Sequence, residues 1–205
     1  MPTNWYPEKL RVASEGTAGT YKFMATVFGA DDAFSYAEFG FYEGNTARNV
    51  ATIFPNASLH LFDYESNCRS VEKKMEPFGS RVRFYPNSQR YCDSYNWSLM
   101  KVVGEKRGLI FDYCFLDGAH TVAIDALTFF LCDKLLKVGG YMDFDDYRWR
   151  MRGSSLDPAA VPVIAEQYTD EHIDAFQVKM IVDNLVRPDG RYKEIVETKV
   201  FQKRA

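Results

Sequence analysis

A strand, a glycine turn and a helix follow one another at residues 34–54, and this stretch constrains the fold most. Residues 34–39 predict a short strand, and residues 40–44 predict a tight turn with glycine at both ends. The next segment has apolar residues at i, i+3 and i+4 spacing, which predicts a helix with one buried face. Asn45 or Thr46 can cap the first amides of that helix. A strand that enters a helix through a glycine turn is the unit with which open α/β sheets build a ligand crevice.

Strand and helix patterns alternate along the rest of the chain. The sequence predicts four more strands before residue 150, separated by helical segments, at residues 58–63, 81–85, 109–116 and 141–145. Two further strands, at 175–182 and 192–201, flank a Pro-Asp-Gly turn signal and predict an antiparallel pair. The predicted fold class is therefore α/β: a Rossmann-like, doubly wound, mostly parallel seven-stranded sheet with a C-terminal antiparallel hairpin and helices on both faces.

Composition narrows the class of protein. A chain of 205 residues with 46% apolar residues predicts a single domain over residues 1–205, with residues 1–33 as an N-terminal helical cover. The chain has no apolar run of about 20 residues and no signal-peptide pattern. Its net charge of −3 argues against nucleic-acid binding, and its four cysteines show no metal-binding spacing. We expect a cytoplasmic protein without nucleic-acid or membrane partners; its oligomeric state, a homo-oligomer included, is open.

Polar residues stand at the ends of the first three predicted strands. The glycine turn departs from the G-x-G-x-x-G pattern, because Phe41 and Tyr42 put side chains where a pyrophosphate needs close backbone approach. A ligand with an amino acid moiety suits this turn better, since the turn offers carbonyls to an ammonium and the helix start offers amides to a carboxylate. Asp63 can accept two ribose hydroxyls, and Asn87 or Ser88 can recognise an adenine edge.

Three aspartates end the fourth and fifth predicted strands: Asp117, Asp145 and Asp146. The carboxyl ends of parallel strands share one edge of the sheet, so these charges would repel each other unless a cation or proton intervened. Oxygen ligands favour magnesium, calcium or manganese, and a divalent ion there can lower the pKa of an acceptor hydroxyl. His120 follows closely and is a candidate general base.

Each of these residues also has an ordinary structural interpretation. His120 can serve as a hydrogen-bonding residue at a helix start, and Asp145 and Asp146 can serve as turn and cap residues. Asp143 stands in a strand where an apolar residue is expected, so it faces a basic partner or marks a less buried position. The arginine- and aromatic-rich residues 147–152 either close over an acidic or sugar-like acceptor or form a solvated loop.

Taken together, these motifs resemble the class I S-adenosylmethionine-dependent methyltransferases. The resemblance extends over somewhat more than half of the chain, between residues 38 and 149. It rests on EFGFYEGN at 38–45, LFD at 61–63, NS at 87–88, FLDGAH at 115–120, LKVGGY at 136–141 and FDDY at 144–147. The last three motifs are similar to those of the subgroup with metal-dependent O-methyltransferases of antibiotic sugars and other natural products.

The resemblance implies an enzyme that transfers a methyl group from S-adenosyl-L-methionine to a hydroxyl of a small molecule, such as a sugar or natural product, with Mg²⁺ as a further cofactor. It implies Asp117 and His120 as catalytic residues, with Asp117, Asp145 and Asp146 as metal ligands. It implies a cofactor site of Glu38, Gly40, Gly44, Asn45, Asp63, Asn87, Ser88 and Asp117. Two alternatives stay open: a metal-independent enzyme with His120 as sole base, and a non-catalytic nucleoside-binding domain that serves in assembly.

Overall fold

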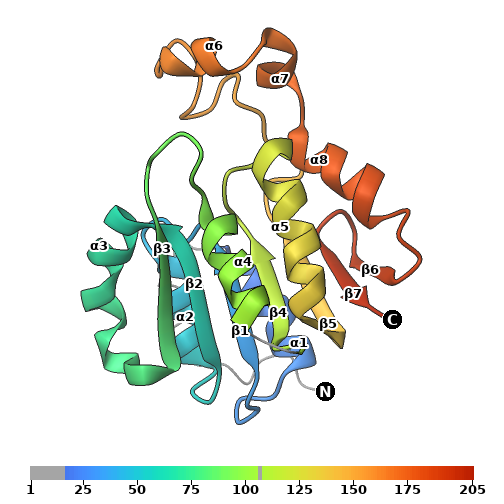
Figure 1. The fold of residues 1–205 in the computed structure, drawn as a ribbon. Helices are drawn as coiled ribbons and strands as arrows, with labels where there is room; N and C mark the ends of the chain where they lie inside the picture. The colour runs from blue at the N-terminus through green and yellow to red at the C-terminus, as the bar shows by residue number, and fades with distance from the viewer. Residues whose placement is uncertain (1–16, 106–107) are drawn as a thin grey trace.

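A computed structural model describes residues 17–105 and 108–205, and a seven-stranded sheet forms its centre (Figure 1). The strand order is β3-β2-β1-β4-β5-β7-β6. Neighbours from β3 to β5 pair in parallel, whereas β7 is antiparallel to both β5 and β6. The strands are β1 (Ser35–Phe39), β2 (Ser58–Tyr64), β3 (Val82–Asn87), β4 (Phe111–Leu116), β5 (Leu136–Phe144), β6 (Tyr192–Val196) and β7 (Val200–Lys203). The predicted seven-stranded, mostly parallel sheet with its C-terminal hairpin is confirmed.

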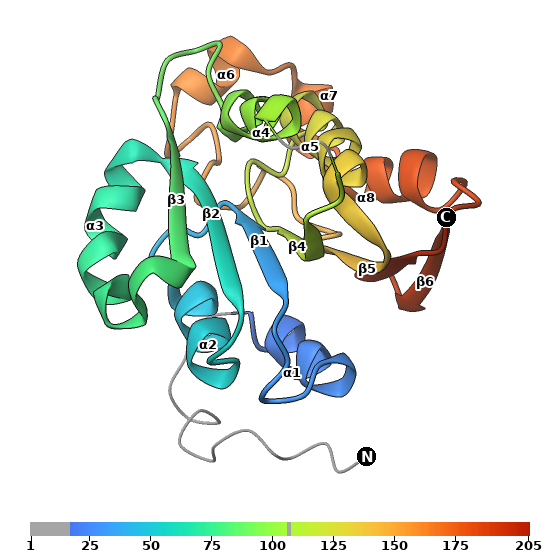
Figure 2. The ribbon, with the colours of Figure 1, turned by 60° about the horizontal axis from the view of Figure 1, so that its bottom comes forward.

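Helices cover both faces of the sheet (Figure 2). One face packs against α1 (Ala18–Val27), α2 (Asn45–Ile53) and α3 (Glu65–Met75), and α3 continues into the 3₁₀-helix η2 (Glu76–Arg81). The other face packs against α4 (Tyr95–Glu105), α5 (Val122–Leu135) and α8 (Gln177–Ile181), and α8 continues into the π-helix η3 (Val182–Val186). The short helices α6 (Val163–Gln167) and α7 (Asp170–Asp174) lie beyond the carboxyl ends of the parallel strands.

Alternation along the strands divides the interior into two cores. In β4, Tyr113 and Phe115 face the core under α1, α2 and α3, whereas Cys114 and Leu116 face the core under α4 and α5. All four side chains are buried. Successive side chains of a strand point to opposite faces, so a strand covered on both sides must be apolar throughout. This requirement explains the nearly continuous apolar run of the fourth strand.

The predicted N-terminal cover falls partly within the structure. Helix α1 lies within the residues of the predicted cover, and Tyr21 and Met24 of this helix are buried in the core with α2. Residues 1–16 of the predicted cover lie outside the described residues. No helix in the part of the chain that the structure describes is long and apolar enough to span a membrane.

The prediction of the C-terminal hairpin was wrong in its boundaries. Residues 175–182, predicted as a strand, are mostly helical, because Val178, Ile181 and Val182 form an i, i+3, i+4 apolar stripe against α5. The predicted strand at 192–201 divides into β6 and β7 around a turn in which Thr198 has a φ of 59°. The β-branched residues favoured a strand, but helical burial against the sheet decided the local structure.

Candidate functional site

The glycine turn after β1 lies directly against the loop after β4. Gly40 has a φ of 79°, and a side chain at this position would overlap the backbone of Asp117 and Gly118. The two segments are joined where Asp117 N donates to Phe39 O at 2.9 Å. Glycine is therefore required at residue 40 both by its backbone angle and by this close approach. The turn brings the predicted cofactor region and the predicted acid cluster to one place.

Asp63 binds the backbone of the glycine turn. Its Oδ2 accepts from Phe41 N at 2.9 Å and from Tyr42 N at 2.8 Å. Its Oδ1 accepts from Tyr64 N at 2.6 Å and from Asn67 Nδ2 at 3.0 Å. These four hydrogen bonds fix the turn against the end of β2. Both carboxylate oxygens of Asp63 already have protein donors. The predicted contact between Asp63 and a ribose stays a prediction.

The N-terminus of α2 opens into a cavity of about 360 Å³, called the inner cavity below. Gly44, with a φ of 73°, is the N-cap, and no side chain caps the helix. The predicted cap is therefore wrong: Thr46 instead accepts from Thr17 N at 2.9 Å. Uncapped amides and the positive end of the helix dipole attract an anionic group. The inner cavity is lined by Thr17, Glu38, Gly40, Phe41, Tyr42, Glu43, Asn45, Thr46, Asp117, Gly118 and His120.

Glu38 is a buried acid on the wall of the inner cavity. Only 1% of its surface is exposed, and Tyr36 Oη donates to its Oε2 at 2.8 Å. Burial raises the pKa of Glu38 to about 8, although the hydrogen bond from Tyr36 opposes that rise. A buried carboxyl in this state favours a nearby positive charge, because the charge replaces the lost solvation.

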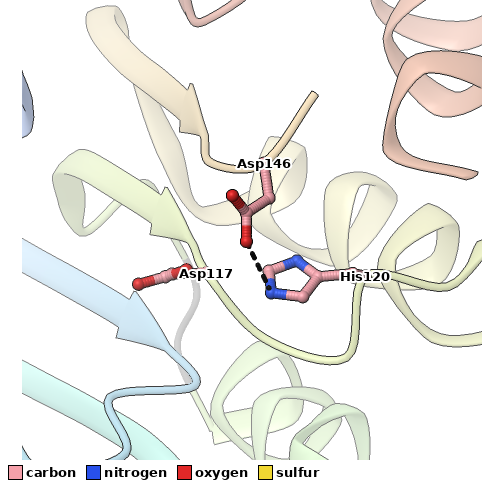
Figure 3. A group of neighbouring side chains, drawn as sticks. All are labelled: Asp117, His120 and Asp146. Atoms are coloured by element: carbon pink, nitrogen blue, oxygen red, sulfur yellow. Dashed lines mark ion pairs between the residues drawn. The ribbon is translucent and has the colours of Figure 1, made fainter. Parts of the chain in front are cut away.

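Three side chains from the ends of β4 and β5 form an acidic group, which we call the acid–histidine group: Asp117, His120 and Asp146 (Figure 3). One ligand atom from each lies within 4.8 Å of the other two. His120 Nε2 is 3.4 Å from an oxygen of Asp146. Two oxygen donors and one imidazole nitrogen at this spacing form a donor set that manganese or magnesium can accept.

The backbone at this group adopts an uncommon conformation. His120 has a φ of 54° and Asp146 has a φ of 56°, both in the left-handed region. Such angles cost free energy in residues other than glycine and persist where the surrounding structure imposes them. They turn the two side chains toward each other, and the ring of Trp149 lies against the His120 ring at a centroid distance of 5.0 Å.

Burial and mutual repulsion raise the pKa values of the two acids in the acid–histidine group. Burial, together with the charges of Asp145, Glu38 and Asp146, raises the pKa of Asp117 to about 9. Burial also raises the pKa of Asp146, and the neighbouring Asp145 adds to this effect while His120 opposes it. A cation placed among these groups would reverse both shifts.

Asp145, which the sequence predicts as a metal ligand, has separate partners. Its Oδ1 is 3.1 Å from Lys199 Nζ, and its Oδ2 accepts from Thr17 Oγ1 at 3.0 Å. Its side chain is not part of the acid–histidine group within the described residues. The structure thus brings together two of the three predicted metal ligands and adds His120, the predicted base, to them.

Asp143 faces a basic partner, which resolves the choice that the sequence left open. Its side chain is fully buried, and its Oδ1 is 2.9 Å from Lys199 Nζ. Tyr113 Oη and Thr20 Oγ1 donate to its Oδ2 at 2.6 and 2.7 Å. A buried carboxylate is tolerated when a cation and hydrogen-bond donors surround it, and here both are present.

A larger cavity of about 970 Å³, called the outer cavity below, lies beyond the ends of β2 and β3. Its wall includes aromatic and amide side chains: Tyr64, Gln89, Tyr91, Asn96, Trp97, Gln167, Tyr168 and Gln177. The predicted adenine-binding residues, Asn87 and Ser88, come directly before Gln89, which lines this cavity. Ser88 bonds Asp93 through its backbone and its hydroxyl, both at 2.7 Å. Asn87 is buried, and its Oδ1 has no hydrogen-bond partner in the part of the chain that the structure describes.

The loop that carries Asp117 and His120 rests on a buried pair that the sequence analysis missed. Tyr95 Oη accepts from Ala119 N at 3.2 Å and donates to the buried carboxylate of Asp125. Gly118 packs so closely on the Tyr95 ring that a larger residue would overlap it. An aspartate within the apolar helix pattern at 122–136 was the signal that could have revealed this support.

The loop at 147–152 is tied to the helices above the sheet. Tyr147 Oη donates to Asp183 at 2.8 Å, and Arg152 forms ion pairs with Asp170 and Asp174. These contacts connect the loop to α7 and η3, but the Arg152 side chain is 39% exposed, so the solvated-loop interpretation stays a prediction. Closure over an acceptor stays a prediction for the rest of the loop.

The comparisons with known proteins agree on the fold. No protein-family model matches the chain, and no curated protein sequence matches it. Among solved structures, an O-methyltransferase from Bacillus cereus in complex with SAH matches with a TM-score of 0.61 and 16% identity, over 93% of this chain and 84% of that chain. The O-methyltransferase TomG from Streptomyces achromogenes, involved in tomaymycin synthesis and in complex with SAM, matches with a TM-score of 0.54 and 16% identity, over 84% and 74%.

A third solved structure shows the breadth of this fold. An rRNA methylase from Streptococcus thermophilus matches with a TM-score of 0.54 and 12% identity, over 94% of this chain and 100% of that chain. All three identities are low, so the likeness concerns the architecture rather than the acceptor. The chain has the fold of the class I S-adenosylmethionine-dependent methyltransferases.

Proposed function

We propose that the protein is an S-adenosylmethionine-dependent methyltransferase that acts on a hydroxyl group of a small molecule. One observation carries the proposal: the inner cavity joins an uncapped helix N-terminus to Asp117 and His120, which are the first two members of the acid–histidine group. The cofactor region and the chemically reactive region thus share one space. In open α/β folds, ligands bind at this carboxyl edge of the sheet.

The inner cavity suits the methionine end of the cofactor by charge. Its walls carry the acids Glu38, Glu43 and Asp117, and no lysine or arginine is among its lining residues in the described chain. An ammonium and a sulfonium both favour such a lining, whereas the carboxylate of the same moiety favours the amides at the start of α2. Burial raises the pKa of Glu38 to about 8, and a positive charge beside it would offset that rise.

The outer cavity suits the adenosine end. It begins at Tyr64, the residue after Asp63, and includes Gln89, two residues after Asn87. Aromatic faces stack on a purine, and the unpaired Oδ1 of Asn87 can accept from an exocyclic amino group. We therefore place the adenine between the ends of β2 and β3, with Asp63 supporting the turn between the two cavities.

Methyl transfer needs an acceptor oxygen in line with the methyl group and a base for its proton. S-adenosylmethionine, when bound, supplies an electrophilic methyl group whose carbon–sulfur bond breaks as the acceptor oxygen bonds to the carbon, with the electron pair leaving on sulfur. His120 takes the hydroxyl proton in this scheme through Nδ1, the ring nitrogen that does not face Asp146, and Asp146, 3.4 Å from Nε2, stabilises the resulting imidazolium. Trp149 keeps the imidazole in place through ring packing.

The acid–histidine group fits a divalent cation. Its donor atoms are hard oxygens with one imidazole, they lie within 4.8 Å of one another, and the pKa of Asp117 is raised to about 9 without a cation. A bound magnesium or manganese ion would lower the pKa of an acceptor hydroxyl. In that case Asp117 and Asp146 hold the ion, and His120 is either the third ligand or the base.

A metal-independent enzyme is the second candidate, and one observation favours it. The pair of His120 and Asp146 already has the arrangement of a histidine oriented by a carboxylate, which is sufficient for general-base catalysis. The acceptor is a small molecule in both cases, since the net charge of −3 and the acidic inner cavity repel nucleic acid. A sugar or other natural product stays our expectation for its class.

Calorimetric titration with S-adenosylhomocysteine tests the proposal. We expect the wild type to bind S-adenosylhomocysteine in the micromolar range. We expect Glu38→Gln to bind it more weakly, because this variant removes the acid from the inner cavity without changing the size of the side chain. Repeating the titration and a methyl-transfer assay with and without Mg²⁺ separates the two candidates. A wild-type protein that does not bind S-adenosylhomocysteine would falsify the methyltransferase assignment.

A further inference from the structure

The carboxyl edge of the sheet has a partly buried lysine next to its acids. Asp117, Asp143, Asp145 and Asp146 all come from the ends of β4 and β5, and Lys199 Nζ lies among them. The lysine contacts Asp143 at 2.9 Å and Asp145 at 3.1 Å. The mechanism above does not use this lysine, so its place in the site needs a separate explanation.

The hairpin between β6 and β7 delivers Lys199 from a distant part of the sequence. Thr198, directly before it, has a φ of 59°, and Thr198 N donates to Glu194 Oε1 at 2.5 Å. Lys199 Nζ also lies 5.1 Å from the centre of the Phe115 ring and donates to Phe144 O at 3.4 Å. Its side chain is 21% exposed. A constrained turn thus fixes the ammonium beside the acids.

This placement uses both oxygens of Asp145. Lys199 takes Oδ1 and Thr17 takes Oδ2, and Asp145 N donates to Leu116 O at 3.0 Å. Lys199 and Thr17 thus hold the side chain of Asp145, which is not part of the acid–histidine group within the described residues although it comes directly before Asp146 in the chain. The lysine charge also acts on Asp117 and Asp146, where it opposes the rise of their pKa values.

We propose that Lys199 is a positioning residue that restrains Asp145 outside the acid–histidine group and weakens the affinity of this group for a divalent cation. The inference rests on the metal-assisted form of the proposed function. A fixed positive charge beside the site repels a second cation, and a carboxylate held by an ammonium is lost to the ligand set. Removal of the lysine therefore adds a ligand and removes a repulsion.

Manganese binding tests this role without an activity assay. Mn²⁺ is titrated into the full-length protein, and the free ion is followed by electron paramagnetic resonance. Lys199→Met is combined with Asp143→Asn, so that no buried carboxylate is left without its cation. We expect this double variant to bind Mn²⁺ roughly tenfold more tightly than the wild type, because Asp145 is released to the ligand set while the charges removed at Lys199 and Asp143 largely cancel.

Two further variants separate positioning from a general effect on stability. Lys199→Arg keeps the charge and should retain the wild-type affinity for Mn²⁺. Asp145→Asn removes a negative charge beside the group and should weaken the wild-type affinity modestly, and it should remove the gain when added to the double variant. Circular dichroism confirms that each variant is folded before the titration, and Lys199→Met alone serves as a second measurement.

The outcomes decide between the hypotheses. Equal or weaker Mn²⁺ binding in the folded double variant would overturn the inference, and so would a gain that survives Asp145→Asn. If the double variant binds Mn²⁺ and the wild type does not, the result supports the inference and counts against metal-assisted catalysis. If neither binds Mn²⁺, both metal claims fail, while the S-adenosylhomocysteine titration still decides the methyltransferase assignment independently.

Discussion

Asp63 and Asp117 occupy equivalent places in the fold and have opposite environments. Each follows or ends a parallel strand at the same edge of the sheet, β2 for Asp63 and β4 for Asp117. Asp63 accepts four hydrogen bonds from neighbouring protein groups. Asp117 receives no hydrogen bond through its side chain from the residues that the structure describes, and its pKa is raised to about 9. One carboxylate stabilises the fold, and the other is kept at a cost in stability.

The difference separates an acid whose charge the protein satisfies from an acid that is buried among like charges. An acid whose charge is satisfied by the protein contributes to folding, whereas an acid kept buried among like charges destabilises the folded state. Such a group is typical of sites that are completed by a ligand. The comparison therefore predicts effects of opposite sign on stability when the two aspartates are made neutral.

The largest effect is expected from Asp117→Asn. We expect the rate of methyl transfer to fall roughly 100-fold or more, because charged groups beside the reacting atoms contribute on this scale. The same variant should melt several degrees higher than the wild type at pH 8, since it removes a carboxyl whose charged form is disfavoured in the folded protein. A methyl-transfer assay and a thermal melt measure the two effects. A lower melting temperature would show that the Asp117 charge is satisfied after all.

Asp63→Asn should have the opposite effect on stability. The amide loses the charge that four donors contact, and its NH₂ group meets donors rather than acceptors. We expect a loss of about 3 kcal/mol in the free energy of unfolding, which corresponds to a fall of about 6–12 °C in melting temperature. Chemical denaturation monitored by circular dichroism measures it. An unchanged stability would remove the contrast with Asp117.

The sequence predicted more of the fold than of the site. Strand and helix periodicity was sufficient for the parallel part of the sheet, because strands buried on both faces must be apolar throughout and helices between them must have one apolar face. The C-terminal part failed at residues 175–182, where β-branched residues lie in a helix. The turn between β6 and β7 has no glycine or proline, so nothing local marked it.

In the site, the sequence located the acids but not their partners. The shared edge of parallel strands follows from the order of elements, which is why Asp117 and Asp146 were placed together. The roles of Asp145 and Asp143 depend on Lys199, which lies more than fifty residues away along the chain. Contacts of this kind are set by the packing of the hairpin, and no local pattern contains them.

The pH dependence of stability provides an effect of intermediate size. The pKa values of Glu38 and Asp117 are raised to about 8 and about 9, far above the values near 4 of unfolded chains. Between these limits the folded protein binds more protons than the unfolded protein, so the free energy of unfolding should fall as the pH rises from 5 to 9. Carboxyls with lowered pKa values, such as Asp133, are already ionised at pH 5 and add little to this slope.

A divalent cation should counteract this loss. At pH 8, Mn²⁺ at ten times its dissociation constant should stabilise the wild type by about 1.4 kcal/mol, and it should have no effect on Asp117→Asn. Thermal melts across the pH range, with and without Mn²⁺, measure both quantities. The slope with pH should also be smaller in Asp117→Asn than in the wild type. A wild-type stability that rises between pH 5 and 9 would contradict the environment inferred for the two acids.

The smallest effect concerns Tyr42, which lies in the turn that Asp63 stabilises. Like His120 and Asp146, Tyr42 has a backbone in the left-handed region. Its φ is 46°, its side chain is 73% exposed, and it lines the inner cavity. In Tyr42→Gly, relief of the left-handed backbone and the larger entropy of the unfolded chain nearly cancel, so stability should change by less than about 0.5 kcal/mol. Affinity for S-adenosylhomocysteine should nevertheless fall about threefold to tenfold, because this variant loses the ring. Protein packing does not explain the exposed position of this ring, and we expect the ring to cover the ligand in the inner cavity.

Tyr42→Asn is the matched control, since asparagine also tolerates the left-handed region but lacks the ring. Both variants should lose affinity equally if the ring contacts the cofactor. If only Tyr42→Gly loses affinity, the backbone of the turn is responsible, and the tyrosine belongs with Asp63 among the structural residues. Tyr42 and His120 differ in exposure but share a left-handed backbone, which two hydrogen bonds from the turn to Asp63 support at Tyr42. At both residues the fold maintains a costly conformation where we expect a ligand.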